Sequence, residues 1–98
     1  MHNPLELAEA LMLAGEMEDA LLALSEQLAD QPDDAETRRV RARLLISLRR
    51  GSEALADLNT LTTPTAHDHL LRAQAYALAG DADGLRNAAL AAPENADA

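Results

Sequence analysis

Three segments of this 98-residue chain repeat one pattern, and this repeat constrains the fold more than any other feature of the sequence. Each segment has an apolar stretch with helical periodicity, a break at a Gly, a second such stretch and a closing Pro. Gly supplies the left-handed residue that ends a helix, and Pro cannot continue one. The breaks and stops are Gly15, Gly51, Gly80, Pro32, Pro64 and Pro93. The pattern predicts one domain of three helix hairpins, over residues 1–34, 35–65 and 66–92, with a frayed tail over 93–98.

The apolar residues favour helices over strands. The chain contains 22 Ala and 19 Leu, but one Val, one Ile, one Tyr and neither Phe nor Trp. Ala and Leu are strong helix formers, whereas β-branched and aromatic residues favour strands. The apolar residues also recur in steps of three and four, as at Leu21, Leu24 and Leu28. We therefore expect an all-α fold.

A set of large and small residues recurs at related places in the three segments. The set comprises Leu7, Ala8, Leu11, Ala20, Leu24 and Pro32, then Ala42, Leu45, Ala54 and Leu58, then Ala73, Tyr76 and Gly80. These residues and their spacing resemble the tetratricopeptide repeat (TPR), a helix hairpin of 34 residues. The resemblance implies a right-handed array of three antiparallel hairpins. Each hairpin stacks on its neighbour because one alone cannot bury its apolar stripe, and the small Ala residues mark close helix crossings.

The chain departs from the TPR pattern mainly in its middle segment. Arg41 replaces an expected Leu there, and Pro64 arrives about three residues early. In the third segment, Leu85 occupies the small-residue place of the second helix. The places of the large aromatic residue that opens each repeat are taken by Pro4, Arg38 and His69. A different array of α-hairpins and a plain helical bundle stay open as alternatives.

The resemblance also implies a function. The first helices of successive TPR hairpins line a concave groove that binds extended or helical peptides. By resemblance, the chain is a cytoplasmic scaffold for a protein or peptide partner and is not an enzyme. Its groove residues would be Leu5, Glu9, Met12, Leu13, Arg39, Arg43, Ile46, Leu70, Gln74 and Ala77. Arg39 and Arg43 lie one helical turn apart, so they share a face that suits a partner's carboxylate, although two solvated side chains are an equal alternative.

The net charge of −9 is distributed unevenly. Residues 1–34 carry nine acidic residues and no Arg, whereas residues 35–65 carry six Arg and three acidic residues, a net +3. Opposite charges attract between copies, and array ends usually need polar caps. These features predict a homodimer. The second functional interpretation is therefore a self-assembling structural module, or a piece of a longer repeat protein.

Several other classes of function lack support in the sequence. The acidic net charge disfavours nucleic-acid binding, and no apolar run is long enough to cross a membrane. The first residues lack the basic start of a signal peptide. No cofactor motif or Cys is present. The sets His67–His69 and Asp33–Glu36 lack metal-ligand spacing, so we interpret both as helix starts and expect no metal.

Overall fold

The computed structural model describes residues 3–91, and in this range it contains six α-helices and no strand. The prediction of an all-α fold is confirmed. The helices are α1 (Pro4–Leu13), α2 (Met17–Asp30), α3 (Ala35–Ser47), α4 (Gly51–Leu58), α5 (Ala66–Ala79) and α6 (Ala82–Ala91). The tail expected to fray, residues 93–98, lies outside the described residues.

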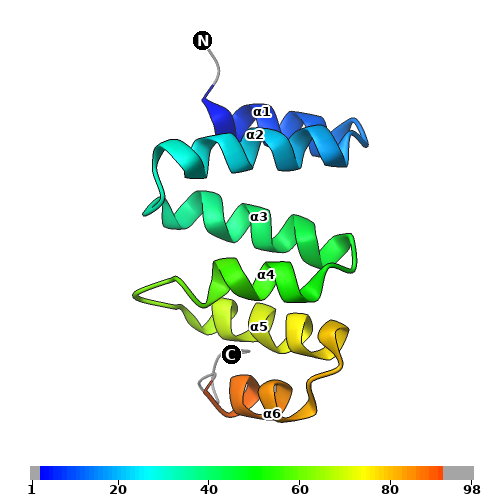
Figure 1. Cartoon of the computed structure of the whole chain (residues 1–98), viewed down its shortest axis with the longest axis vertical. Helices are drawn as coiled ribbons and strands as arrows, with labels where there is room; N and C mark the ends of the chain where they lie inside the picture. Colours follow the sequence, from blue (N-terminus) through cyan, green and yellow to red (C-terminus); the bar gives the residue numbers. More distant parts are fainter. Residues whose placement is uncertain (1–2, 92–98) are drawn as a thin grey trace.

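The helices follow one another along the long axis of a stack that measures 41 × 26 × 24 Å (Figure 1). Each helix packs on the next one in the chain, and α3 also contacts α5 directly. The turns α1–α2, α3–α4 and α5–α6 lie at one edge of the stack, and the longer links lie at the opposite edge (Figure 1). The helices α1, α3 and α5 therefore run in the same direction.

The first helix of each hairpin begins at a capping side chain. Asn3 accepts a hydrogen bond from the backbone N–H of Glu6 at 2.8 Å, and Asp34 accepts one from Thr37 at 3.2 Å. Thr65 and Asp68 cap each other's backbone at the start of α5. Such caps satisfy the free N–H groups of the first turn, so they fix where these helices start. The helices α2 and α4 have no side-chain cap and begin directly after a tight turn.

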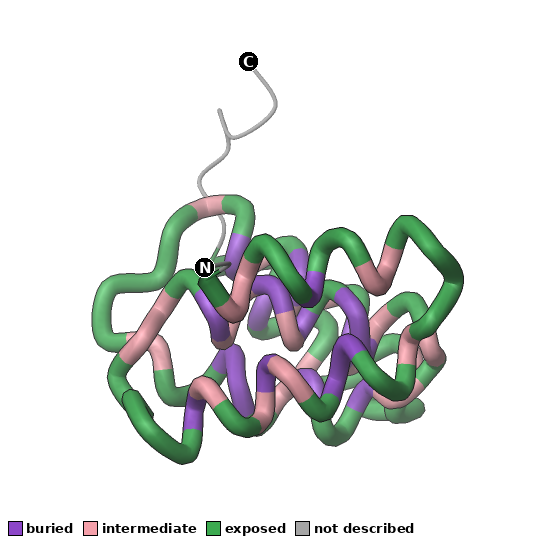
Figure 2. Tube along the Cα trace, turned by 90° about the horizontal axis from the view of Figure 1, so that it is seen from above, coloured by how far each residue is buried: buried purple, intermediate pink, exposed green. Residues whose placement is uncertain are grey.

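Small residues at the predicted crossings are buried completely. Ala8, Ala20, Ala42 and Ala54 have no exposed surface, which lets neighbouring helices approach closely. Buried positions gather in the interior of the stack and exposed positions line its outside (Figure 2). The prediction for Ala73 is wrong: this residue is only half-buried, and Ala75 is the fully buried alanine of α5. Ala75 faces α4, where its carbonyl oxygen lies next to Gly51.

Gly51 does not break the third helix, contrary to the prediction. The left-handed residue of the α3–α4 turn is Arg49, with φ +65°. Gly51 is instead the buried first residue of α4, and it packs against α5. A Cβ atom at this place would lie 2.5 Å from the carbonyl oxygen of Ala75 and 2.8 Å from Cβ of Leu78. Glycine is required here because any side chain would overlap α5, not because the chain turns at this residue.

In the last hairpin the close contact is made by Gly84, next to the place where the repeat pattern has a small residue and this chain has Leu85. A Cβ atom on Gly84 would collide with the ring of Tyr76, so glycine is the residue that lets α6 approach α5. Leu85 lies at the surface instead. Tyr76 is the only Phe, Trp or Tyr residue of the chain. Its ring occupies the space between α5 and α6 in which a side chain on Gly84 would otherwise lie. Gly84, the residue before Leu85, therefore makes the close contact between α6 and α5.

Candidate partner-binding face

All ten residues predicted to line a groove lie on α1, α3 or α5, and none of them is buried. We call this set the α1–α3–α5 face. Its residues come from the first helices of the three hairpins, which run in the same direction (Figure 1). Leu5, Met12 and Ile46 are partly buried against the core, whereas Glu9, Leu13, Arg43, Leu70, Gln74 and Ala77 are exposed and available for contact.

Three residues of this face line one hollow of about 500 Å³ between α3 and α5. The α3 side contributes Ile46, Ser47 and Arg49, and the α5 side contributes Gln74, Ala77 and Leu78. We call this site the turn-edge hollow, because α3 and α5 both end there. The α1 members of the face do not line it. The site is mostly apolar, with one guanidinium at its rim.

Arg39 is already bound to a carboxylate of the same chain. Its Nε lies 3.0 Å from both carboxylate oxygens of Asp68, and its Nη2 lies 3.0 Å from Oδ2. Asp68 is buried and also accepts the backbone N–H of Thr65 at 2.8 Å. Burial raises the pKa of this carboxyl, but the hydrogen bonds from Thr65 and Arg39 outweigh burial and lower it. The ion pair ties the middle of the stack to the start of α5.

Arg43 has no such partner. Its side chain is exposed and makes no hydrogen bond or ion pair within residues 3–91, and the same is true of the side chain of Arg49. The structure thus separates the predicted pair: Arg39 holds two helices together, whereas Arg43 faces solvent. The unengaged cations near the turn-edge hollow are Arg43 and Arg49.

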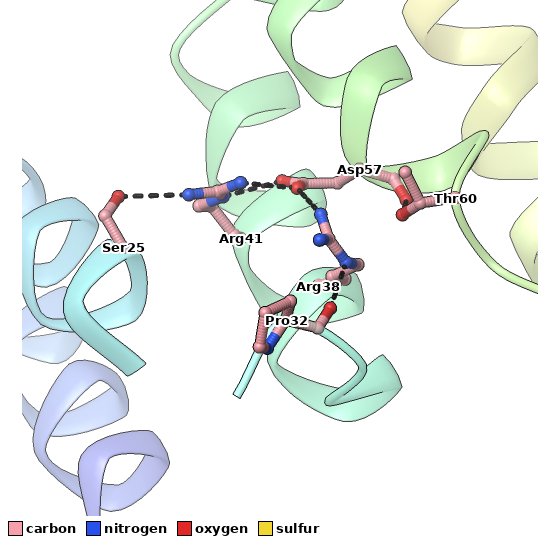
Figure 3. Close-up of polar contacts among 6 residues, drawn as sticks. All are labelled: Ser25, Pro32, Arg38, Arg41, Asp57 and Thr60. Atoms are coloured by element: carbon pink, nitrogen blue, oxygen red, sulfur yellow. Dashed lines mark hydrogen bonds and ion pairs between the residues drawn. The ribbon is translucent and has the colours of Figure 1, made fainter. Parts of the chain in front are cut away.

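The middle hairpin contains a cluster of charged side chains, Arg38, Arg41 and Asp57, that the sequence analysis did not predict (Figure 3). Asp57 on α4 is completely buried. Arg41 binds both of its carboxylate oxygens, with Nε at 2.8 Å and Nη2 at 2.6 Å, and Arg38 binds one with Nη1 at 3.0 Å. The remaining guanidinium nitrogens reach Ser25 on α2, at 3.1 Å, and the carbonyl oxygen of Pro32, at 2.9 Å. One carboxylate therefore joins α2, α3 and α4.

The first hairpin shows what this cluster replaces. At a distance of 34 residues, Arg38, Arg41 and Asp57 correspond to Pro4, Leu7 and Ala23. In the first hairpin these apolar residues line a hollow of about 230 Å³. In the middle hairpin, the same seam is filled by three charged side chains. The signal in the sequence was a double departure, because Arg38 and Arg41 both stand at places where the family pattern is apolar.

Arg50 is the fourth arginine of the middle hairpin that is bound to a carboxylate of the chain. It binds Glu53 through two hydrogen bonds of 2.8 and 2.7 Å, and it lies 3.5 Å from Glu18 on α2. Four of the six arginines in residues 35–65 are therefore engaged within the described residues, and two are not. Arg43 and Arg49 therefore carry two positive charges of this segment that no carboxylate of the described residues pairs with.

A second hollow, of about 520 Å³, lies on another side of the stack between α2, α3 and α4. Its floor contains Leu21 and Leu45, and its charged residues include Arg41 and Arg50. Both guanidinium groups are paired with carboxylates of the chain. Arg41 shares Asp57 with Arg38, so the cluster beside this hollow keeps one positive charge.

The two acidic or histidine-containing sets are helix starts. Asp34 caps α3 and also accepts hydrogen bonds from Gln27, at 3.1 Å, and from the Thr37 hydroxyl, at 2.8 Å, which lower the pKa of its carboxyl. His69 contacts Arg72 at 3.2 Å, and His67 is exposed. Within residues 3–91 no three His, Asp or Glu side chains are grouped so that they could hold a metal ion.

Comparisons with family models, with curated proteins and with solved structures find no match to this chain. Across the described helices, none is both long and apolar enough to span a bilayer.

Proposed function

We propose that this chain is a TPR-like scaffold of three hairpins that binds an acidic protein or peptide on its α1–α3–α5 face, in the cytoplasm. The single observation that carries the proposal is the turn-edge hollow beside two unengaged arginines. The order of the hairpins and the fully buried Ala8, Ala20, Ala42 and Ala54 support the TPR-like arrangement.

The partner's chemistry follows from this face. The hollow accepts an apolar side chain against Ile46, Ala77 and Leu78. A carboxylate nearby binds the guanidinium of Arg43 or Arg49, because Arg presents several donors in a fork that fits a carboxylate. Arg39 contributes to the shape of the face rather than to the charge offered to a partner, since Asp68 neutralises it.

Capture from an extract of the source cells tests the proposal. Immobilised wild-type chain retains a partner, and Arg43→Glu/Arg49→Glu releases it. Arg86→Glu is the matched control, because Arg86 is an exposed arginine on α6, away from the face. A partner that is lost equally with Arg86→Glu, or retained by Arg43→Glu/Arg49→Glu, would rule out this face as the binding site.

A second candidate function is self-assembly. Leu13 is 91% exposed, more than any other large apolar residue of the described chain. A leucine this open at the end of α1 is a feature that a second copy can cover.

A further inference from the structure

The end of α1 presents an exposed leucine with an acidic residue before it and another after it in the sequence. Leu13 is almost fully exposed, and Glu9 lies one helical turn before it on the same side of the helix. Glu16 follows at the same end of α1, in the turn to α2. Neither glutamate side chain makes a hydrogen bond or an ion pair within residues 3–91. We call Glu9, Leu13 and Glu16 the acidic knob.

The turn-edge hollow has the complementary composition. Its apolar walls are Ile46, Ala77 and Leu78. Of the two unengaged cations, Arg49 lines the hollow and Arg43 lies one helical turn before Ile46 and Ser47 on α3. The acidic knob thus offers one leucine with two carboxylates, and the hollow offers one apolar space with two guanidinium groups. These are the unengaged charges of opposite sign that the structure places at the ends of α1 and α3.

The knob and the hollow also lie on the same side and at the same edge of the molecule. Leu13 corresponds by the repeat to Ser47, and Ser47 and Leu78 both line the hollow. The ends of α1, α3 and α5 all lie at the edge formed by the three hairpin turns (Figure 1). The knob is therefore one hairpin away from the hollow along the same edge, which is too far for it to fill the hollow of its own chain.

We propose that two copies of this chain form an antiparallel dimer in which Leu13 of each copy fills the turn-edge hollow of the other. A twofold axis between the two chains makes both contacts at once, because each copy offers one knob and one hollow on the same edge. The carboxylates of Glu9 and Glu16 then face Arg43 and Arg49 of the second copy. This dimer goes beyond the proposed function, and a partner bound in the hollow excludes it.

The proposal differs from dimerisation through the first end of the stack. At a distance of 34 residues, the buried Val40 and Leu44, which pack within the array, correspond to Glu6 and Ala10 on α1. Both of these residues are exposed and neither is large and apolar, so two buried apolar places of the middle hairpin have no large apolar counterpart at this end. The edge that carries Leu13 is a better dimer contact than the end of the stack.

Charge reversal tests the proposal on the purified chain. Arg43→Glu/Arg49→Glu places four acidic groups at each contact, and Glu9→Arg/Glu16→Arg places four basic groups there. Each variant alone is expected to sediment at the monomer mass of 10.5 kDa, whereas the wild type sediments at twice that mass. An equimolar mixture of the two variants restores the dimer, because both contacts of the mixed pair are complementary.

Leucine substitutions test the apolar part. Leu13→Ala is expected to weaken the dimer about a hundredfold, since the change is made at two contacts and each exposes about one leucine's apolar area. Leu22→Ala is the matched control, because Leu22 is an exposed leucine on α2 that lies outside the proposed contact. Its dimer dissociation constant should equal that of the wild type.

Three results overturn the dimer. The first is a wild type that remains monomeric at high micromolar concentration. The second is a mixture of the charge variants that fails to pair while both variants keep the wild-type helical circular dichroism. The third is mass that grows with concentration beyond the dimer, because an open chain of contacts lacks the twofold axis. None of these results affects the proposed function, whose test is the capture of a different protein.

Discussion

Arg41 of α3 donates hydrogen bonds to both carboxylate oxygens of Asp57 on α4, and this pair lies where the first hairpin has Leu7 and Ala23. The same seam between two helices is thus closed by apolar residues in one hairpin and by an ion pair in the next. A buried carboxylate with two guanidinium partners is sensitive to the loss of one member, because the others remain desolvated and unpaired.

Asp57→Ala should destabilise the fold by about 3 kcal/mol, since it leaves Arg38 and Arg41 without their carboxylate. The double variant Arg41→Leu/Asp57→Ala copies Leu7 and Ala23 of the first hairpin and leaves only Arg38 unpaired, so it should cost less than Asp57→Ala alone, because an apolar pair can replace a buried ion pair. Urea unfolding followed by circular dichroism measures both. If the double variant were as unstable as the sum of the two single variants, the cluster would not act as one unit.

Stability should fall in acid partly through Asp68. The pKa of this carboxyl is lowered in the folded protein, so its contribution is complete above the ordinary aspartate pKa, near 4, and disappears as the pH falls through the lowered folded value. Asp68→Asn should cost about 2–3 kcal/mol at pH 7. The difference from wild type should shrink steadily as the pH is lowered below about 4.

Asp33→Asn is the control for this pH dependence, because Asp33 is exposed and makes no hydrogen bond or ion pair within residues 3–91. It should change the free energy of unfolding by less than about 0.5 kcal/mol both at pH 7 and below about pH 4. A gap between wild type and Asp68→Asn that stays constant from neutral pH into acid would show that the charge of Asp68 is not what stabilises the link to α3.

Gly51→Ala should destabilise the fold by about 1–3 kcal/mol, because the new methyl group overlaps the backbone of α5. Gly15→Ala makes a useful comparison. A Cβ at Gly15 meets nothing within 4 Å, but its φ of +81° is strained for alanine, so we expect a cost of about 1 kcal/mol. Thermal and urea unfolding rank the two variants. A milder effect at Gly51 than at Gly15 would contradict the close packing of α4 on α5.

Ala20→Leu should also destabilise the protein by about 1–3 kcal/mol, since Ala20 has no exposed surface and no room for three further carbon atoms. Ala29→Leu is the matched surface change on the same helix, because Ala29 is exposed. It should leave the melting temperature close to that of wild type. An unchanged melting temperature for Ala20→Leu would remove this residue from the helix crossing.

The sequence was sufficient to predict the helices and most of the close crossings. Regular spacing of Leu and Ala reports which side of a helix is buried, and this relationship is local. The prediction failed where the choice of residue depends on a neighbouring hairpin. Gly51 stands where the pattern predicts a turn but packs on α5, and Ala75, next to which it lies, is the fully buried alanine of α5 in place of Ala73.

The candidate site was predictable in position but not in charge. Helix periodicity placed Arg39 and Arg43 on one face, since residues four apart are neighbours. It could not tell that Asp68, which is 29 residues away, binds Arg39 and leaves Arg43 free. Pairing across helices depends on the stacking distance and on side-chain reach, and neither is encoded in the spacing of residues on one helix.

Selection of random displayed peptides on the immobilised chain tests the binding face most directly. We predict enrichment of peptides with Asp or Glu close to Leu or Ile. These peptides should bind wild type and Arg86→Glu but not Arg43→Glu/Arg49→Glu. Enrichment of basic peptides, or of peptides that bind Arg43→Glu/Arg49→Glu as tightly as wild type, would contradict an acidic partner on the α1–α3–α5 face.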